Sequence, residues 1–120
     1  MIVYLDRQLL GGRCEGQTQF MAAGAGYRYL RVTVETDVVN DRLIALLGHE
    51  LRHAVEVADA PSVVDERSYA SLYRRIGHGS AQCRRPGSCF DTNAAIASGY
   101  RVLDEVRHAP ADPESGNVTR

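Results

Sequence analysis

The chain has 120 residues, of which 44% are hydrophobic and 24% charged, and its net charge is −1. This length and composition are typical of one small domain with a single core. The near-zero charge predicts no nucleic-acid partner, and no apolar run is long enough to span a membrane. No signal peptide is visible before the first expected strand. A cytoplasmic location is therefore expected by default, or an extracytoplasmic one if an N-terminal leader is missing.

Three β-strands are expected in the first third of the chain. They cover residues 2–6, 17–23 and 27–35. The third strand alternates most clearly, with Leu30, Val32 and Val34 pointing to one face. The AGAG at 23–26 is typical of a hairpin turn between the second and the third strand.

Three helices are expected after the strands. They cover residues 41–59, 65–76 and 92–107. Asn40 or Asp41 can cap the first helix, and Pro61 ends it because a proline disfavours helical geometry in the preceding residue. Asp91 or Thr92 can cap the last helix. The core-facing stripe of the first helix consists of Leu43, Leu46, Leu47, Ala54 and Val57.

The order of the elements, strands first and helices after, predicts an α+β fold. In it, a small antiparallel sheet packs against the first helix and two further helices. Residues 1–108 are expected to form this single domain. The tail at 109–120 is poor in apolar residues and is expected to be disordered.

Three cysteines bear on the redox compartment without settling it. Cys83 and Cys89 flank a Pro-Gly turn, and this spacing fits either a small disulfide loop or two free thiols. Cys14 has no evident partner. The CxxC spacing of cysteine-based zinc sites is absent from the sequence.

The most informative stretch is H-E-x-x-H at residues 49–53, which falls within the first expected helix. Residues four apart lie about 40° apart around a helix and roughly 6 Å along it, so His49 and His53 can converge on one metal ion. Glu50 is turned about 100° from His49, too far to join them as a ligand on that face. It can instead reach a water molecule bound to zinc and take its proton.

On this motif the chain resembles the zincin superfamily of zinc metallopeptidases, and in particular small gluzincin-like bacterial H-E-x-x-H proteins. The strand YRYLRVTVE and the helix RLIALLGHELRHAVEVAD resemble the edge strand and the active-site helix of that fold. LYRRIG and FDTNAAIASGYRVLDEV extend the resemblance over roughly residues 2–107. The resemblance implies a Zn²⁺ cofactor, a peptide or protein substrate, and an edge strand that pairs with the extended substrate along the cleft.

A third protein ligand is expected to complete the site, and several residues are candidates. Gluzincins take a carboxylate from a later helix, so the resemblance implies Asp91, at the start of the last helix. Asp59 holds the last position of the metzincin pattern, but Glu56 stands in place of the glycine that turns the chain there. Glu56 lies about 10.5 Å along the helix axis from His49, which predicts an outer contact or a solvated side chain rather than coordination. The remaining candidates are Glu66, His78, His108 and, in place of a third protein ligand, a water molecule.

The sequence therefore predicts a zinc metallopeptidase in which His49, His53 and Asp91 bind Zn²⁺ and Glu50 is the general base. Candidate donors to the oxyanion are Tyr69, Tyr73, His78 and Tyr100, with packing or a surface loop as the alternative explanation. Two other functions stay open: a zinc-binding domain without turnover, and an interaction module whose histidines are incidental. The substrate, the cleavage preference and the oligomeric state do not follow from the sequence.

Overall fold

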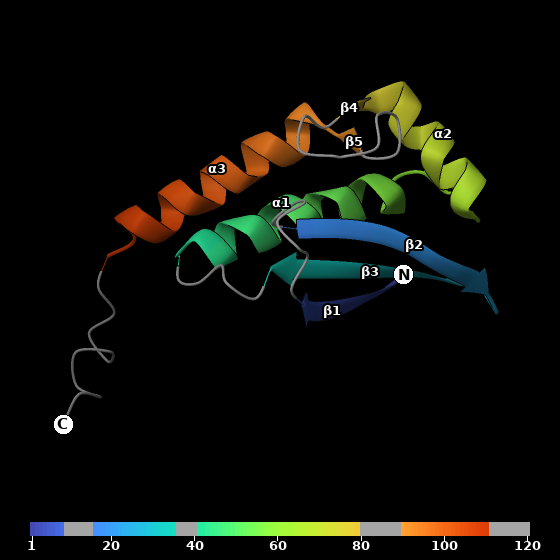
Figure 1. The fold of residues 1–120 in the computed structure, drawn as a ribbon, viewed down its shortest axis with the longest axis horizontal. Helices are drawn as coiled ribbons and strands as arrows, with labels where there is room; N and C mark the ends of the chain where they lie inside the picture. The colour runs from blue at the N-terminus through green and yellow to red at the C-terminus, as the bar shows by residue number, and fades with distance from the viewer. Residues whose placement is uncertain (9–15, 36–40, 80–89, 111–120) are drawn as a thin grey trace.

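A three-stranded sheet with one long helix across its face forms the centre of the molecule (Figure 1). The computed structural model describes residues 1–8, 16–35, 41–79 and 90–110. The strands of the sheet are β1 (Ile2–Gln8), β2 (Gly16–Gly24) and β3 (Tyr27–Glu35). The helices are α1 (Asp41–Ala58), α2 (Glu66–Ile76) and α3 (Asn93–His108). The predicted α+β architecture with three helices is therefore confirmed.

The sheet is mixed, so the prediction of an antiparallel sheet is wrong. Its order is β1-β3-β2, in which β2 pairs antiparallel with β3 and β1 pairs parallel with it. The strand at 27–35 is thus the central strand and not the edge strand that the resemblance implied. The strand next along the chain from β1 is β2, not its partner β3, and a parallel pair has no hairpin turn. Nothing in the local sequence therefore marks this pairing.

A two-residue turn joins β2 to β3, as the AGAG motif predicts. Ala25 has φ 52° and Gly26 has φ 81°, so both residues are left-handed, as in the type I′ turn that matches the twist of a hairpin. A bulge between Phe20 and Ala22 shifts the register of β2. Before the bulge, Thr18 pairs with Val32, and that register places the Thr18 side chain on the face that α1 covers.

The core lies between the sheet, the second half of α1 and α2. It consists of Phe20, Leu30, Ala54, Val57, Val63, Leu72 and Tyr73. The alternation of β3 buries Leu30 completely, and the helical period of α1 places Ala54 and Val57 opposite it. Burying one large aliphatic side chain contributes about 1.5–3 kcal/mol, so this cluster holds α1 against the sheet.

Arg28, on β3, fixes the C-terminal end of α1. Its guanidinium donates to four backbone carbonyl oxygens, those of Val57 (2.8 Å), Ala58 (3.3 Å), Ala60 (2.9 Å) and Val63 (3.3 Å). The last carbonyls of a helix have no partner within the helix. A cation at this end also interacts favourably with the negative end of the helix dipole. The helix ends at Ala58, shortly before Pro61, as the sequence predicts.

Both later helices begin with a side-chain cap. Asp65 and Ser68 form a capping box at the start of α2. At the start of α3, Thr92 Oγ1 accepts a hydrogen bond from Ala95 N at 3.1 Å. Of the two predicted caps of this helix, Thr92 is therefore the one used. The Asp91 carboxylate remains available for other contacts.

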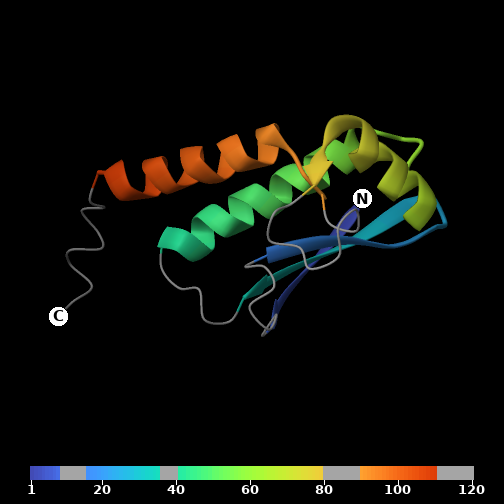
Figure 2. The same ribbon diagram turned by 45° about the horizontal axis from the view of Figure 1, so that its top comes forward.

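α3 runs antiparallel to α1, along the side of α1 that faces away from the sheet (Figures 1 and 2). Two glycines permit this close contact. A Cβ at Gly48 would lie 2.7 Å from Val102 Cγ2, and one at Gly99 would lie 3.3 Å from His49 Cβ. The helix pair thus brings the start of α3 close to the turn of α1 that carries the histidines.

A short ladder that the sequence did not predict closes the fold on this side. β4 (His78–Gly79) pairs antiparallel with β5 (Phe90–Asp91), between the second and third predicted helices, where no strand was expected. The three cysteines and the tail from residue 111 lie outside the described residues, so the disulfide and the disordered tail stay predictions. Within the described residues, no helix is long and apolar enough to cross a membrane.

Candidate metal centre

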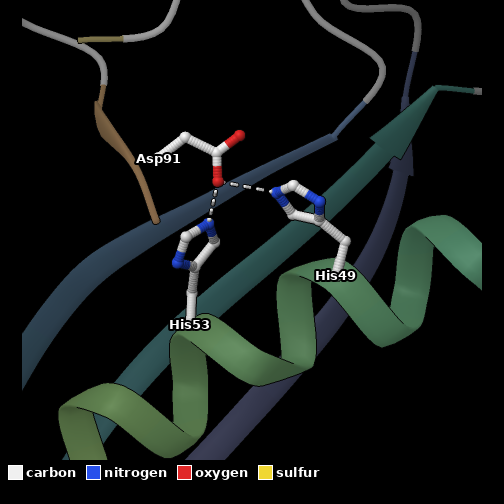
Figure 3. A group of neighbouring side chains, drawn as sticks. All are labelled: His49, His53 and Asp91. Atoms are coloured by element: carbon white, nitrogen blue, oxygen red, sulfur yellow. Dashed lines mark ion pairs between the residues drawn. The ribbon is translucent and has the colours of Figure 1, made fainter. Parts of the chain in front are cut away.

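His49, Glu50 and His53 lie in the middle of α1, and Glu50 points in a different direction from the two histidines. The two imidazoles point toward the same place, as the four-residue spacing predicts (Figure 3). Glu50 points to the sheet side of the helix and is 5% exposed. The arrangement of these three side chains follows directly from the helical period.

Asp91 meets both imidazoles. Its Oδ1 lies 3.0 Å from His49 Nε2 and 3.3 Å from His53 Nε2, as the dashed lines in Figure 3 mark. The β4–β5 ladder and the Thr92 cap hold this carboxylate over α1. The ligand atoms of the three residues all lie within 4.8 Å of one another, so together they form a group that could hold a metal ion.

The spacing of the ligand atoms in this group is compatible with a metal ion. Zinc bonds of about 2.0–2.2 Å place neighbouring tetrahedral ligand atoms roughly 3.3–3.6 Å apart, close to the two N–O separations found here. Asp91 Oδ1 also lies 2.8 Å from Thr92 N, so three nitrogen atoms converge on one oxygen that has about two lone-pair directions. A cation between the three side chains would relieve this crowding.

Glu50 is held beside the group by the neighbouring strand. The Thr18 hydroxyl on β2 donates to Glu50 Oε2 at 2.6 Å. Gly16, also on β2, leaves the room that the carboxylate needs, since a Cβ there would lie 2.8 Å from Glu50 Oε1. Burial raises the pKa of Glu50, although the Thr18 hydrogen bond and the two histidines act in the opposite direction.

Glu56 lies behind His53, on the side away from Asp91. Its Oε1 is 2.7 Å from His53 Nδ1, and its Oε2 accepts a hydrogen bond from Thr92 Oγ1 at 2.7 Å. The Tyr73 hydroxyl donates to His53 O at 3.1 Å and to Glu56 Oε1 at 3.3 Å. The sequence predicted that Glu56 would contact a ligand or solvent rather than coordinate, and the contact with His53 agrees with the first possibility.

The electrostatics of the site favour a positive charge. Three carboxylates, Glu50, Glu56 and Asp91, surround two imidazoles. Burial lowers the pKa of His53. The Asp91 hydrogen bond and the charges of Glu50 and Glu56 raise it by more than burial lowers it, so the pKa of His53 lies above its ordinary value. Burial opposes the ionised form of Asp91, yet the hydrogen bonds from both histidines hold the pKa of its carboxyl well below the usual range. A proton on His53 or a metal ion would each supply the missing positive charge.

The other predicted ligands lie apart from this group. Asp59 follows the end of α1 and Glu66 begins α2, and both side chains are exposed. His78 is exposed on β4, and His108 pairs with Asp104 at the end of α3. Among the described residues, the metal-binding group contains none of these four.

The candidate oxyanion donors divide into two kinds. The Tyr69 hydroxyl donates to Thr18 O at 2.8 Å, and the Tyr73 hydroxyl is engaged at His53 O. Burial raises the pKa of both tyrosines. Their rings pack on each other, which supports the packing explanation. Tyr100 and His78 are exposed, Tyr100 by 71% on α3.

Sequence reasoning missed the two threonines that contact the acidic residues of the site. Thr18 could have been found from the alternation of β2, because it shares its face with the apolar Phe20 two residues on. Thr92 was predicted only as a possible helix cap, and no sequence signal links it to Glu56. Its second contact depends on how α3 packs against α1.

Comparison with known proteins gives no further guide to the site: no family model, no curated protein and no solved structure matches the chain. The resemblance to zincins therefore stays a prediction.

Proposed function

We propose that the chain is a zinc-dependent metallopeptidase. The observation that carries this proposal is the convergence of His49 and His53 on one oxygen of Asp91, with the buried Glu50 carboxylate beside them. Two imidazoles and one carboxylate are a common ligand set of catalytic zinc, in which a further position stays open for water or substrate. The choice of a peptide as substrate rests on the resemblance of the H-E-x-x-H helix to zincins.

When bound, zinc would supply a Lewis acid for the substrate carbonyl and lower the pKa of a coordinated water to about 7. Glu50 would accept the proton of the attacking water and return it to the leaving amine. The Thr18 hydroxyl occupies Oε2, which leaves Oε1 to exchange that proton. Burial raises the pKa of Glu50, and this favours a group that must both take and give a proton.

The exposure of the ligands indicates how a substrate would approach. The side chains of His49 and Asp91 are 21% and 20% exposed, whereas His53 is 7% exposed. The open side of the site is therefore at His49 and Asp91. The sheet edge beside Glu50 is β2, and its Thr18 carbonyl already accepts the Tyr69 hydrogen bond. An extended substrate would have to pair elsewhere on β2 or displace Tyr69.

The first experiment tests the metal. Zinc content is measured by elemental analysis in the wild-type protein and in His49→Ala, with His108→Ala as a matched control on the exposed end of α3. We expect about one zinc per chain in the wild type and the control, and little in His49→Ala. Equal, near-zero zinc in all three would overturn the proposal.

The second experiment tests the reaction. Cleavage of a quenched fluorescent peptide library is measured for the zinc-loaded wild type, for Glu50→Gln, and for Glu105→Gln as the control at an exposed glutamate. We expect Glu50→Gln to keep its zinc and to lose at least about a hundredfold in rate. Unchanged cleavage would remove Glu50 from the mechanism. A zinc-loaded wild type that cleaves nothing would leave a metal site without turnover.

A further inference from the structure

His53 is held at both of its ring nitrogens, which sets it apart from His49. Nε2 faces Asp91 Oδ1 at 3.3 Å, and Nδ1 faces Glu56 Oε1 at 2.7 Å. The side chains of His53 and Glu56 are 7% and 9% exposed, so water contributes little to this contact. The orientation of the ring is therefore decided by protein groups.

The Thr92 hydroxyl fixes the direction of the hydrogen bonds around Glu56. Thr92 Oγ1 accepts the N–H of Ala95 as the cap of α3, so its own proton is free to be donated. It donates this proton to Glu56 Oε2 at 2.7 Å. An ionised carboxylate has only acceptors, so Glu56 Oε1 accepts a hydrogen bond from the N–H of His53 Nδ1. The neutral ring then carries its lone pair on Nε2, the nitrogen that points to Asp91.

Asp91 and Thr92 are adjacent in the chain, and they act on opposite sides of the same ring. Asp91 contacts Nε2 directly, and Thr92 acts on Nδ1 through Glu56. Because Thr92 is also the N-cap of α3, the same hydroxyl joins the start of that helix to the histidine. The position of α3 on α1 and the tautomer of His53 are thus coupled.

We propose that Glu56 and Thr92 are positioning residues of the metal site. They hold His53 in the tautomer whose Nε2 can bind a cation, and they lock the ring in the direction of Asp91. Mutation of a partner of this kind typically weakens metal affinity by about 10- to 100-fold. This inference rests on the metal site of the proposed function and not on peptide hydrolysis.

The test measures metal affinity directly. Binding of Zn²⁺ and Co²⁺ is measured by competition with a chromophoric chelator for the wild type, Thr92→Val, Thr92→Ser and Glu56→Gln. We expect about a 10- to 100-fold loss of affinity in Thr92→Val and Glu56→Gln, and near wild-type affinity in Thr92→Ser, which keeps the hydroxyl. The visible spectrum of bound Co²⁺ should change in Thr92→Val and Glu56→Gln and not in Thr92→Ser.

A matched control separates positioning from helix capping. Asp65→Ala removes the cap of α2, at a residue that is exposed and apart from the metal-binding group. It should weaken a helix start in the same way as Thr92→Val and leave metal affinity unchanged. The double variant Glu56→Gln/Thr92→Val should lose little more affinity than either single variant, since both act on one hydrogen-bond chain.

The outcomes distinguish this inference from the proposed function. A wild type that binds metal, with Thr92→Val and Glu56→Gln binding as tightly as Asp65→Ala, would overturn the inference and leave the metal site in place. A wild type that binds neither ion would overturn both. If Thr92→Val does not fold, Glu56→Gln against the wild type makes the same test.

Discussion

Two regions on adjacent turns of α1 differ in the kind of side chain they contain. One is the apolar cluster beneath the second half of α1, and the other is the polar group where α1 meets β5. The cluster joins Ala54 and Val57 to Leu30 and its neighbours without any charged side chain. At the junction, His49, His53 and Asp91 converge within reach of two further carboxylates. Burial of apolar surface stabilises the first region. In the second region burial is unfavourable unless each charged group has a partner.

This difference indicates what each region is for. Three carboxylates around two imidazoles would be a costly way to hold α1 in place, because buried ion pairs often contribute less than apolar side chains of similar volume. The apolar cluster already holds the helix. The polar group contributes in a different way: its three ligand side chains could hold a metal ion that supplies the missing positive charge.

The largest effect is expected in the cluster. Leu30→Ala removes a completely buried side chain and should lower the free energy of unfolding by about 2–5 kcal/mol, measured by urea denaturation. The zinc affinity of the folded protein should not change. Leu51→Ala, at a position on α1 that is 41% exposed, is the control and should stay within about 0.5 kcal/mol of the wild type. Equal losses in both variants would contradict the assigned core.

The next effect concerns the site and leaves the fold intact. Thr18→Val removes the hydroxyl that donates to Glu50 at 2.6 Å, a bond to a charged group worth about 1.5–3 kcal/mol. We expect zinc content to be retained and the rate of peptide hydrolysis to fall roughly ten- to a hundredfold. Thr18→Ser keeps the hydroxyl and should stay close to the wild type. Equal rates in the two variants would show that Thr18 does not orient Glu50.

A smaller effect is expected where a charge stabilises the fold. Arg28→Met leaves the carbonyls at the end of α1 without their donor and should lower the free energy of unfolding by about 1–3 kcal/mol. Arg74→Met, at an exposed position on α2, is the matched control and should change stability by about 0.5 kcal/mol or less. If both variants unfold at the same urea concentration, Arg28 does not have this role.

The smallest effect is a pH dependence that should reverse when zinc is added. In the metal-free protein the pKa of His53 is raised, so its charged contacts with Asp91 and Glu56 stabilise the fold fully below its unfolded pKa of about 6.5. This contribution is lost as the pH rises through the folded pKa. The raised pKa of Glu50 acts in the same direction.

Zinc needs the neutral ring, so the stabilisation by zinc should grow over the same pH range. Melting temperatures in chelator and in excess zinc, at about pH 6 and about pH 8, measure both trends. The zinc-induced rise in melting temperature should be larger at the higher pH. A rise that is larger at the lower pH would argue against coordination by His53.

Local patterns in the sequence predicted most of the elements. The strand at 27–35 has the predicted bounds, and α1 begins and ends within a residue of its predicted range. The left-handed turn at Ala25 and Gly26 follows from the AGAG motif. Each of these depends on neighbours a few residues away, which is why period and turn chemistry are enough.

The candidate metal centre could be predicted in part for the same reason. His49 and His53 face one another because they are one helical turn apart, and this spacing does not depend on the rest of the fold. The choice of Asp91 over Asp59 and Glu66 drew on a resemblance, and its proximity to the histidines depends on Thr92 taking the cap and on the β4–β5 ladder. Neither of these could be read from spacing.

The sequence by itself determined the helix, the hairpin and the facing pair of imidazoles, since all three depend on backbone geometry within a few residues. The tertiary structure decided that the sheet is mixed, that Thr18 holds Glu50, and that Thr92 and Glu56 hold His53 from behind. The Thr18–Glu50 and Thr92–Glu56 contacts join residues 32 and 36 positions apart. They exist because the apolar cluster and the α1–α3 packing fix the distances between elements, and no local period encodes those distances.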